Sequence, residues 1–296
     1  MQVKNSSKKP VIKIAKMEKK PKLPKKKQRF ILFKVILSVI IIFFLLSFSF
    51  AFYIIYNAPT FSKDSLYTKE SSIILDNSGN EIARLGSENR EIVSYNELPQ
   101  VLVDAIVATE DSRFFQHNGF DIARFIKAIS GHLEGNDSAG GASTLTMQLS
   151  KNAFTSTESK GVKGLVRKFT DIYMAVFKIE KNYSKEELLE IYANYPYLGS
   201  GCYGVEMASE TYFGKSVSNL SLPEAALIAG LFNAPSDNDP YSNLSNATKR
   251  RDCVLELMYK HGYITEEQMD DAESISVSSL LNKTKSSSNQ YQDFID

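Results

Sequence analysis

An uninterrupted apolar run near the start of the chain is the strongest pattern in the sequence. Residues 35–55 read VILSVIIIFFLLSFSFAFYII, 21 positions without a charged side chain. As a helix rising about 1.5 Å per residue, this run spans about 32 Å, the thickness of a bilayer's hydrocarbon core. A cleaved secretory signal has a shorter apolar run and a small-residue cleavage site, and neither is evident. The pattern therefore predicts an uncleaved transmembrane signal anchor over residues 35–56.

Beyond the anchor, the pattern predicts one hairpin and then helices. Two short β-prone runs flank the turn Asn77-Ser-Gly-Asn80, which indicates a hairpin, and strand signals are almost absent after Gly86. A capping box, Ser94-Tyr-Asn-Glu97, begins a helix that ends at Glu110. One face of this helix carries Leu98, Leu102, Ala105, Ile106 and Thr109.

Later segments show the same helical spacing. Capping boxes at Ser184–Glu187 and Ser221–Glu224 each begin a further helix. Apolar stripes at helical spacing are formed by Ile122, Phe125, Ile126 and Ile129 and by Val166, Phe169, Met174, Val176 and Ile179. The outer part is therefore expected to be mainly α.

Charge divides the chain into two regions of opposite sign. Residues 1–34 carry 13 Lys and Arg against the single acid Glu18, and the remainder carries 22 bases against 33 acids. A basic arm followed by an anchor favours a membrane surface over nucleic acid, and the positive-inside rule places the arm in the cytoplasm and the outer part outside the cell membrane. We expect a single-pass protein with a cytoplasmic arm (1–34), an anchor (35–56), a polar stalk (57–71), a helical domain (72–274) and a disordered polar tail (275–296).

Cysteine and histidine give weaker signals. Cys202 and Cys253 are 51 positions apart, so they are expected to be free thiols, although a bridge in an oxidising compartment stays open. The histidines at 117, 132 and 261 fall into no metal-ligand spacing.

Four segments could carry chemistry, and each has an ordinary structural reading as well. Two acids, Glu110 and Asp111, end a helix and could form acid-base machinery or a solvated face. The segment GGASTLTMQLSKNAF (140–154) reads as a helix cap or an anion-binding helix start, with Thr144, Gln148 and Lys151 on one face. Arg167 and Asp171 in RKFTD lie one turn apart, as in a surface ion pair. A Tyr/Gly-rich run covers 190–215.

Taken in order, these segments resemble the peptidoglycan glycosyltransferase family, which includes the monofunctional cell-wall enzymes and the N-terminal domain of class A penicillin-binding proteins. The resemblance covers roughly Ile73 to Thr265. It is carried by five motifs: EDSRFFQHNGFD, GASTLTMQLSKN, RKFTD, EIYANYPYLGSGCYGVEMASETYFGK and LSLPEAALIAGLFNAPS.

The resemblance implies a lysozyme-like helical domain with a small membrane-proximal lobe. It implies polymerisation of lipid II with inversion, forming a β-1,4 bond to the nascent glycan strand, and release of polyprenyl diphosphate. Glu110 would be the catalytic base supported by Asp111, and Asp171 would assist at the pyrophosphate, directly or through Mg²⁺ or Mn²⁺; no other cofactor is expected, and the metal ligands are unknown. Substrate would be bound by Lys151, Arg167, Lys168, Ser143, Thr144, Gln148, Asn152 and His117, although His117 alone reads more readily as a hydrogen-bonded structural residue.

Four positions depart from the family's pattern. Asp171 replaces the usual Glu, Met147 stands where a Gln would offer a hydrogen bond at the cleft edge, and Pro196 and Phe232 are unusual. Asp171 and Met147 motivate an inactive membrane scaffold as one rival hypothesis. A lysozyme-like hydrolase, which would also use one Glu at the end of a helix, is another, although hydrolysis needs no cations for a pyrophosphate. The 31 residues after Thr265 are too few for a transpeptidase domain, so peptide cross-linking is expected from partner transpeptidases, and penicillin should not acylate this chain.

Overall fold

The computed structural model describes residues 24–62, 65–66, 72–75, 77, 81–85, 89–133, 141, 143–155 and 160–282. The chain divides into two compact units, residues 1–53 and 54–296. Most of the predicted cytoplasmic arm lies outside the described residues, as does the end of the predicted tail.

The first unit is dominated by one helix. Helix α1 (Lys25–Asn57) begins ten residues before the apolar run, and its last residues belong to the second unit. Lys, Arg and Gln are good helix formers, so the helix extends into the charged flank. Its length and composition suffice to cross a membrane, and its apolar side chains from Phe30 to Tyr53 are largely exposed.

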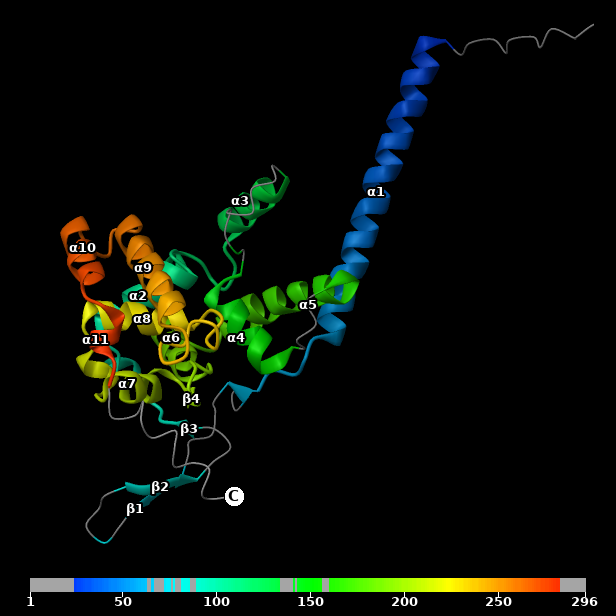
Figure 1. Ribbon diagram of the computed structural model, residues 1–296. Helices are drawn as coiled ribbons and strands as arrows, with labels where there is room; N and C mark the ends of the chain where they lie inside the picture. The colour runs from blue at the N-terminus through cyan, green and yellow to red at the C-terminus, as the bar shows by residue number, and fades with distance from the viewer. Residues whose placement is uncertain are drawn as a thin grey trace, which may run out of the picture. The chain divides into compact units, whose positions relative to one another are not determined.

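The core of the second unit is built from three helices packed on one another: α2 (Gln100–Glu110), α8 (Leu222–Leu231) and α9 (Leu244–Lys260) (Figure 1). Helix α8 is buried from Pro223 to Leu231. Its sequence LPEAALIAGL is rich in small residues, which lets neighbouring helices approach on every side.

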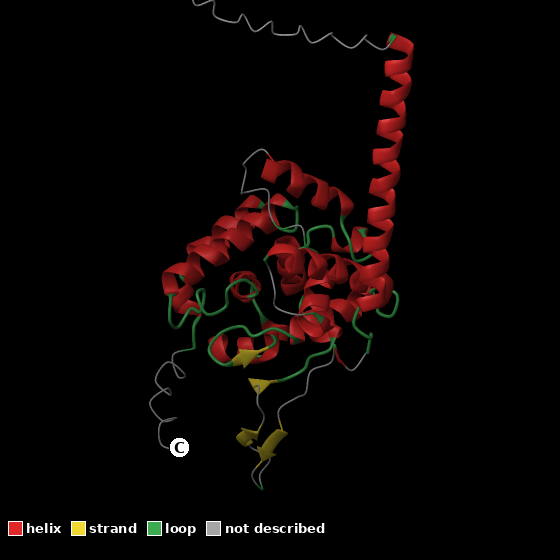
Figure 2. Ribbon diagram, turned by 90° about the vertical axis from the view of Figure 1, so that its right-hand side faces the viewer, coloured by secondary structure: helices red, strands yellow, loops and turns green. Residues whose placement is uncertain are grey.

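Helices also make up nearly all of the rest of this unit, and the strands are short (Figure 2). The other α-helices are α3 (Ile122–Leu133), α4 (Leu145–Phe154), α5 (Gly161–Met174), α6 (Lys185–Asn194), α7 (Val205–Phe213), α10 (Glu266–Ser274) and α11 (Val277–Leu280). Helix α5 continues directly into the π-helix η5 (Ala175–Ile179), and 3₁₀ turns cover Tyr95–Glu97, Phe114–Gln116 and Val217–Asn219. Strands β1 (Ser72–Leu75) and β2 (Glu81–Leu85) form the predicted antiparallel hairpin, and β3 (Asn89–Arg90) pairs in parallel with β4 (Cys202–Tyr203). The mainly α fold is confirmed.

Two of the three predicted helix starts are confirmed. Capping boxes open α6 at Ser184 and α8 at Ser221. The box at Ser94 is also present, but it closes a 3₁₀ turn, and α2 begins later, at Gln100. Pro99 explains the difference, because a residue before proline is driven out of the helical region, and Leu98 has φ −75° and ψ 120°.

The predicted tail boundary at 274 is too early. Helix α11 follows it, with Val277 buried, and the backbone N–H of Asn282 donates to the carbonyl of Tyr212 at 2.7 Å. The ordered domain therefore extends at least to residue 282. Leu66 in the predicted stalk is likewise buried in the core.

Apolar side chains are exposed on α3 and α5. On α3, Ile122 is 64% exposed and Ile126 58%; on α5, Val162 is 78% exposed and Leu165 52%. On each helix the two residues lie one turn apart, which makes them candidates for an interaction surface. We call these four residues the apolar face.

Candidate active site

Glu110 is the last residue of α2, as the sequence predicts, and its carboxylate is held from α4. Gln148 Nε2 donates to Glu110 Oε2 at 2.8 Å. The Gln148 amide is oriented in turn by Tyr192, whose hydroxyl donates to Gln148 Oε1 at 3.1 Å. Because the amide oxygen is occupied, its nitrogen faces the carboxylate.

Tyr192 is fixed by packing. It is buried, and its ring stacks on Phe232, with centroids 5.0 Å apart and planes 10° apart. Burial raises the pKa of Tyr192 well above 10.0, and the negative charges of Glu110 and Asp111 act in the same direction. Its hydroxyl therefore stays protonated and remains a donor at any working pH.

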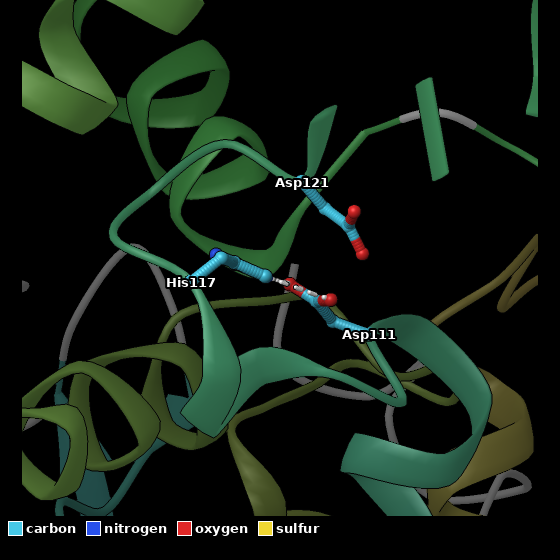
Figure 3. A group of neighbouring side chains, drawn as sticks. All are labelled: Asp111, His117 and Asp121. Carbon is cyan, nitrogen blue, oxygen red and sulfur yellow. Dashed lines mark hydrogen bonds and ion pairs between the residues drawn. The ribbon is translucent and has the colours of Figure 1, made fainter. Parts of the chain in front are cut away.

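Asp111 joins the end of α2 to the start of α4. It is fully buried, and its Oδ2 accepts the backbone N–H of Leu145, the first residue of α4, at 3.0 Å. The Nε2 atom of His117 lies 3.1 Å from both carboxylate oxygens (Figure 3). Asp111 therefore ties the end of α2 to the start of α4 without facing solvent.

His117 differs from its predicted role as a substrate-binding residue. Its side chain is only 9% exposed, and its ring is directed at Asp111. The ordinary structural reading of this histidine fits its position better, because a ring held by a buried carboxylate has little surface left for a sugar.

Arg124 is a site residue that the sequence analysis missed. Its Nη1 donates to the carbonyl of Glu110 at 2.8 Å and its Nε to the carbonyl of Gly141 at 2.7 Å. A cation at the C-terminus of α2 donates to a carbonyl that has no partner within the helix, and its charge interacts favourably with the negative end of the helix dipole. The only sequence signal that could have indicated Arg124 is its position three residues after Asp121, in the first turn of the helix that follows the first motif.

Asp121 anchors the start of α3. It accepts the backbone N–H of Arg124 at 2.8 Å and the Nε of Arg113 at 2.8 Å. Burial alone would raise the pKa of Asp121, but the hydrogen bonds from Arg113 and Arg124 outweigh it and lower that pKa. The loop between α2 and α3 is thus fixed at both ends.

Asp171 and Arg167 form the predicted pair on α5, with Arg167 Nη1 3.5 Å from Asp171 Oδ2. Asp171 is 3% exposed and also accepts the hydroxyl of Thr155 at 2.7 Å and that of Ser150 at 3.5 Å. Burial raises the pKa of Asp171, against the hydrogen bond from Thr155 and the charge of Arg167. This shorter acid therefore reaches Arg167 and suits positioning it better than contact with substrate.

The remaining predicted cations are Lys151 on α4 and Lys168 on α5. Lys151 lies in the last turn of α4 and is exposed. Its positive charge favours the ionised form of Asp171 and so opposes the rise in the pKa of that carboxyl. Lys151 follows Gln148 by three residues, so the two share a face of α4. Lys168 Nζ lies 5.8 Å from the ring centroid of Phe125 on α3. Helix α4 thus connects the carboxylate of Glu110 with the cations of α4 and α5.

Two residues at the start of α4 that were placed at the cleft are internal instead. Thr144 is fully buried as the N-cap of α4, accepting the N–H of Met147 at 3.2 Å and donating to the carbonyl of Gly119 at 2.7 Å. Met147 is also buried, so it fills the core and does not lie at a cleft edge. Capping thus occupies Thr144, which was predicted to bind substrate, and core packing occupies Met147, which was predicted to stand at the cleft edge. Ser143 is half-buried and Asn152 exposed, and both remain available.

Similar proteins are known for most of the chain. The transglycosylase family model matches residues 78–259. The chain belongs to the transglycosylase family. Its relatives include penicillin-binding protein 1A of Streptococcus oralis, 41% identical over 82% of this chain and 38% of the relative, and penicillin-binding protein 1A/1B of Bacillus subtilis (strain 168), 36% identical over 93% of this chain and 31% of the relative. A crystal structure of penicillin-binding protein 1A from Haemophilus influenzae matches 71% of this chain and 21% of its own at 27% identity, with a TM-score of 0.42.

The transglycosylase match confirms the predicted resemblance. The chain spans about a third of the length of the two relatives described above. The family model covers the segments that carry Glu110, Lys151, Arg167 and Asp171.

Two places in the site carry acidic side chains that could bind a divalent cation, the Asp111–His117–Asp121 cluster and Asp171, and neither is well suited to one. Ligand atoms of Asp111, His117 and Asp121 lie within 4.8 Å of one another, but Asp121 is bound by Arg113, and Arg124 Nη1 lies 3.6 Å from Asp111 Oδ1. At Asp171 the carboxylate is likewise paired with Arg167. Adjacent guanidinium groups oppose a cation, so no step is assigned to a metal. Cys202 is a buried free thiol and Cys253 a half-buried one, as expected.

Proposed function

We propose that this protein is a membrane-anchored peptidoglycan glycosyltransferase that polymerises lipid II. The acceptor is lipid II and the donor is the nascent glycan on its polyprenyl diphosphate. The acceptor 4-hydroxyl attacks C1 of the donor, the bond from C1 to the phosphate oxygen breaks, and a β-1,4 bond forms with inversion. Polyprenyl diphosphate leaves with the bonding electron pair.

Glu110 is the base that takes the proton of the 4-hydroxyl. The observation that carries this role is the hydrogen bond from Gln148, fixed by Tyr192, which holds one carboxylate oxygen and leaves the other for substrate. A base whose direction is fixed in advance need not be ordered during the reaction.

Lys151, Arg167 and Lys168 stabilise the departing diphosphate. Charge develops on the phosphate oxygens as the C1–O bond breaks, and cations held in place lower the energy of that state. Asp171 positions Arg167, while Ser143 and Asn152 are the remaining predicted hydrogen-bonding groups with exposed surface.

Membrane attachment fits this chemistry, because both substrates carry lipid tails. The anchor confines the enzyme to the plane of its substrates and raises their effective concentration. The arm is proposed to lie in the cytoplasm and the second unit outside, by the positive-inside rule. The apolar face supports a lobe that dips into the bilayer.

Purified full-length protein incubated with lipid II tests this function. Polymer should form, Glu110→Gln should lose at least about a hundredfold in rate, and Lys151→Ala should lose most turnover. Shortening of finished glycan without polymer from lipid II would instead identify a hydrolase. Equal traces of product from the native protein and Glu110→Gln would identify a scaffold.

Peptide cross-linking is proposed to belong to partner transpeptidases. On this proposal, labelled penicillin should leave the chain unlabelled while lipid II is polymerised. Covalent labelling would refute that division of labour.

A further inference from the structure

We propose that a cavity next to the end of the anchor binds the head group of an anionic phospholipid. The cavity has a volume of about 580 Å³ and lies wholly within residues 54–296. Its lining includes Pro59 and Phe61, which follow α1, and Phe177, Lys178 and Lys181, which lie in η5 or just after it. The proposal is independent of glycosyl transfer and requires only that the anchor spans a bilayer.

Chain connectivity places this cavity at the level of the head groups. The apolar run ends at Ile55, which itself lines the cavity. Helix α1 continues to Asn57, about 3 Å further, and Pro59 follows within about 7 Å more at full extension. Head groups occupy roughly 5–8 Å beyond the hydrocarbon core. Pro59 therefore lies at or next to that layer, however the rest of the domain is oriented.

The charge of the cavity is positive. Among the described residues, neither Lys178 nor Lys181 pairs with a carboxylate. Glu180 lies between them in sequence, but its Oε1 is engaged by Lys185 at 2.8 Å and by the hydroxyl of Thr146 at 2.6 Å. The two ammonium groups are therefore available to an anion.

Aromatic rings hold both lysines at the wall of the cavity. Lys178 Nζ lies 5.8 Å from the ring centroid of Tyr173, and Lys181 Nζ lies 5.5 Å from that of Phe177. The two rings pack with centroids 5.5 Å apart. Phe177 is still 52% exposed, so an apolar surface lies directly beside two cations.

This combination matches one class of occupant. A phospholipid presents a phosphodiester anion joined to acyl chains, so the lysines contact the phosphate while Phe61 and Phe177 contact the glycerol and upper chain. A free phosphate would not use the apolar wall. The cavity's size lies within the range of roughly 300–1,000 Å³ usual for small-ligand sites.

The experiment compares lipid selectivity in bilayers. Full-length protein is reconstituted into phosphatidylcholine nanodiscs, and the immobilised fraction of spin-labelled phosphatidylglycerol is measured against spin-labelled phosphatidylcholine. The native protein should prefer phosphatidylglycerol. The double variant Lys178→Gln/Lys181→Gln should reduce that preference by at least about fivefold, since each lysine near a membrane surface adds roughly that factor.

Matched variants separate this site from general charge. Lys249→Gln/Lys260→Gln removes two exposed lysines from α9 and should leave the preference unchanged. Phe177→Ala keeps both charges but removes the wall, and should weaken the preference as well. Unchanged melting temperatures would show that these variants remain folded.

Three results would overturn the proposal. The double variant could keep the native preference, as it would if the basic arm alone attracted the lipid. The α9 variant could lose as much preference as the cavity variant. A polyprenyl diphosphate lipid could displace phosphatidylglycerol from the native protein, which would reassign the cavity to substrate.

Discussion

Glu110 depends on a relay of two side chains from other helices. Gln148 on α4 donates to it, and Tyr192 on α6 fixes Gln148. Phe232, an unusual residue at its position, stacks on the ring of Tyr192 and so fixes the position of the Tyr192 hydroxyl. This departure from the family's pattern therefore has a structural role next to the proposed base.

Removing one hydroxyl should test the relay. Tyr192→Phe keeps the stack on Phe232 but lets the Gln148 amide rotate, so polymerisation of lipid II should slow about fivefold, as expected for one hydrogen bond of about 1 kcal/mol. Tyr241→Phe also removes a hydroxyl, one that donates to the carbonyls of Thr211 and Asn282, and should not slow polymerisation. Equal rates for the native protein and Tyr192→Phe would refute the relay.

Asp171 should make stability depend on pH. Burial raises the pKa of Asp171 in the folded state above the ordinary 3.8 of the unfolded state. At pH values between the unfolded-state pKa and the folded-state pKa, the folded protein therefore binds more protons than the unfolded protein. Stability conferred at low pH is therefore lost as pH rises from about 4 through the raised pKa. Asp171→Asn cannot ionise, and its melting temperature should gain on that of the native protein over this window.

Asp121 provides a control of opposite sign. Its pKa is lowered, so it stabilises the folded state above about 4 and loses this effect as pH falls. Asp121→Asn should therefore lose melting temperature at neutral pH and converge with the native protein in acid. A constant gap between Asp171→Asn and the native protein at all pH values would exclude the proposed titration.

Sequence reasoning located Glu110 but not its partners, for a physical reason. The position of Glu110 follows from local periodicity, whereas Gln148 and Arg124 reach it across 38 and 14 positions of chain, and Tyr192 reaches Gln148 across 44. Such contacts depend on how helices pack. The same limit explains why Thr144 was assigned to substrate and Met147 to the cleft edge, although tertiary packing buries both.

At the scale of elements, the loop after α2 is locked against the π-helix η5. Gly119 has φ 81°, and a Cβ there would lie 2.9 Å from the backbone carbon of Ala175. π-Helical turns interrupt regular helices and often lie at functional sites. Here the turn contacts the loop that carries His117 and Asp121.

Two glycines separate collision from conformational strain. Gly201 also has a positive φ, 77°, but no described atom lies within 4 Å of an added Cβ. Gly201→Ala should cost about 1 kcal/mol, or roughly 2–4 °C of melting temperature, from strain alone. Gly119→Ala adds the backbone collision and should cost at least about twice as much. Equal losses in thermal melts would show that the loop is not locked in this way.

Helix boundaries were predictable where the signal is local. Ser184 and Ser221 open helices as expected, because a capping box satisfies backbone donors within one turn. Ser94 shows the limit of that rule, since Pro99 delays α2. Helix α11 lies in a Ser-rich segment, and its burial of Val277 against the domain could not be read from composition.

At the scale of the whole molecule, attachment to the bilayer should raise the rate at which the domain meets lipid II, without changing the chemical step itself. In the proposed function the anchor and the substrates share a plane, so removal of residues 1–57 should leave the domain able to react but rarely near lipid II. In vesicles that contain lipid II, the fragment 58–296 should polymerise at least about tenfold more slowly than the full chain.

A substrate with a short, water-soluble chain should abolish this difference, because confinement then offers no advantage. We expect the apolar face to give the fragment some affinity for the bilayer of its own. Replacing Ile122 and Ile126 by Ser in the fragment should therefore slow it further in vesicles, without effect on the soluble substrate. Equal rates for fragment and full chain in vesicles would show that the anchor retains the protein at the membrane but does not contribute to turnover.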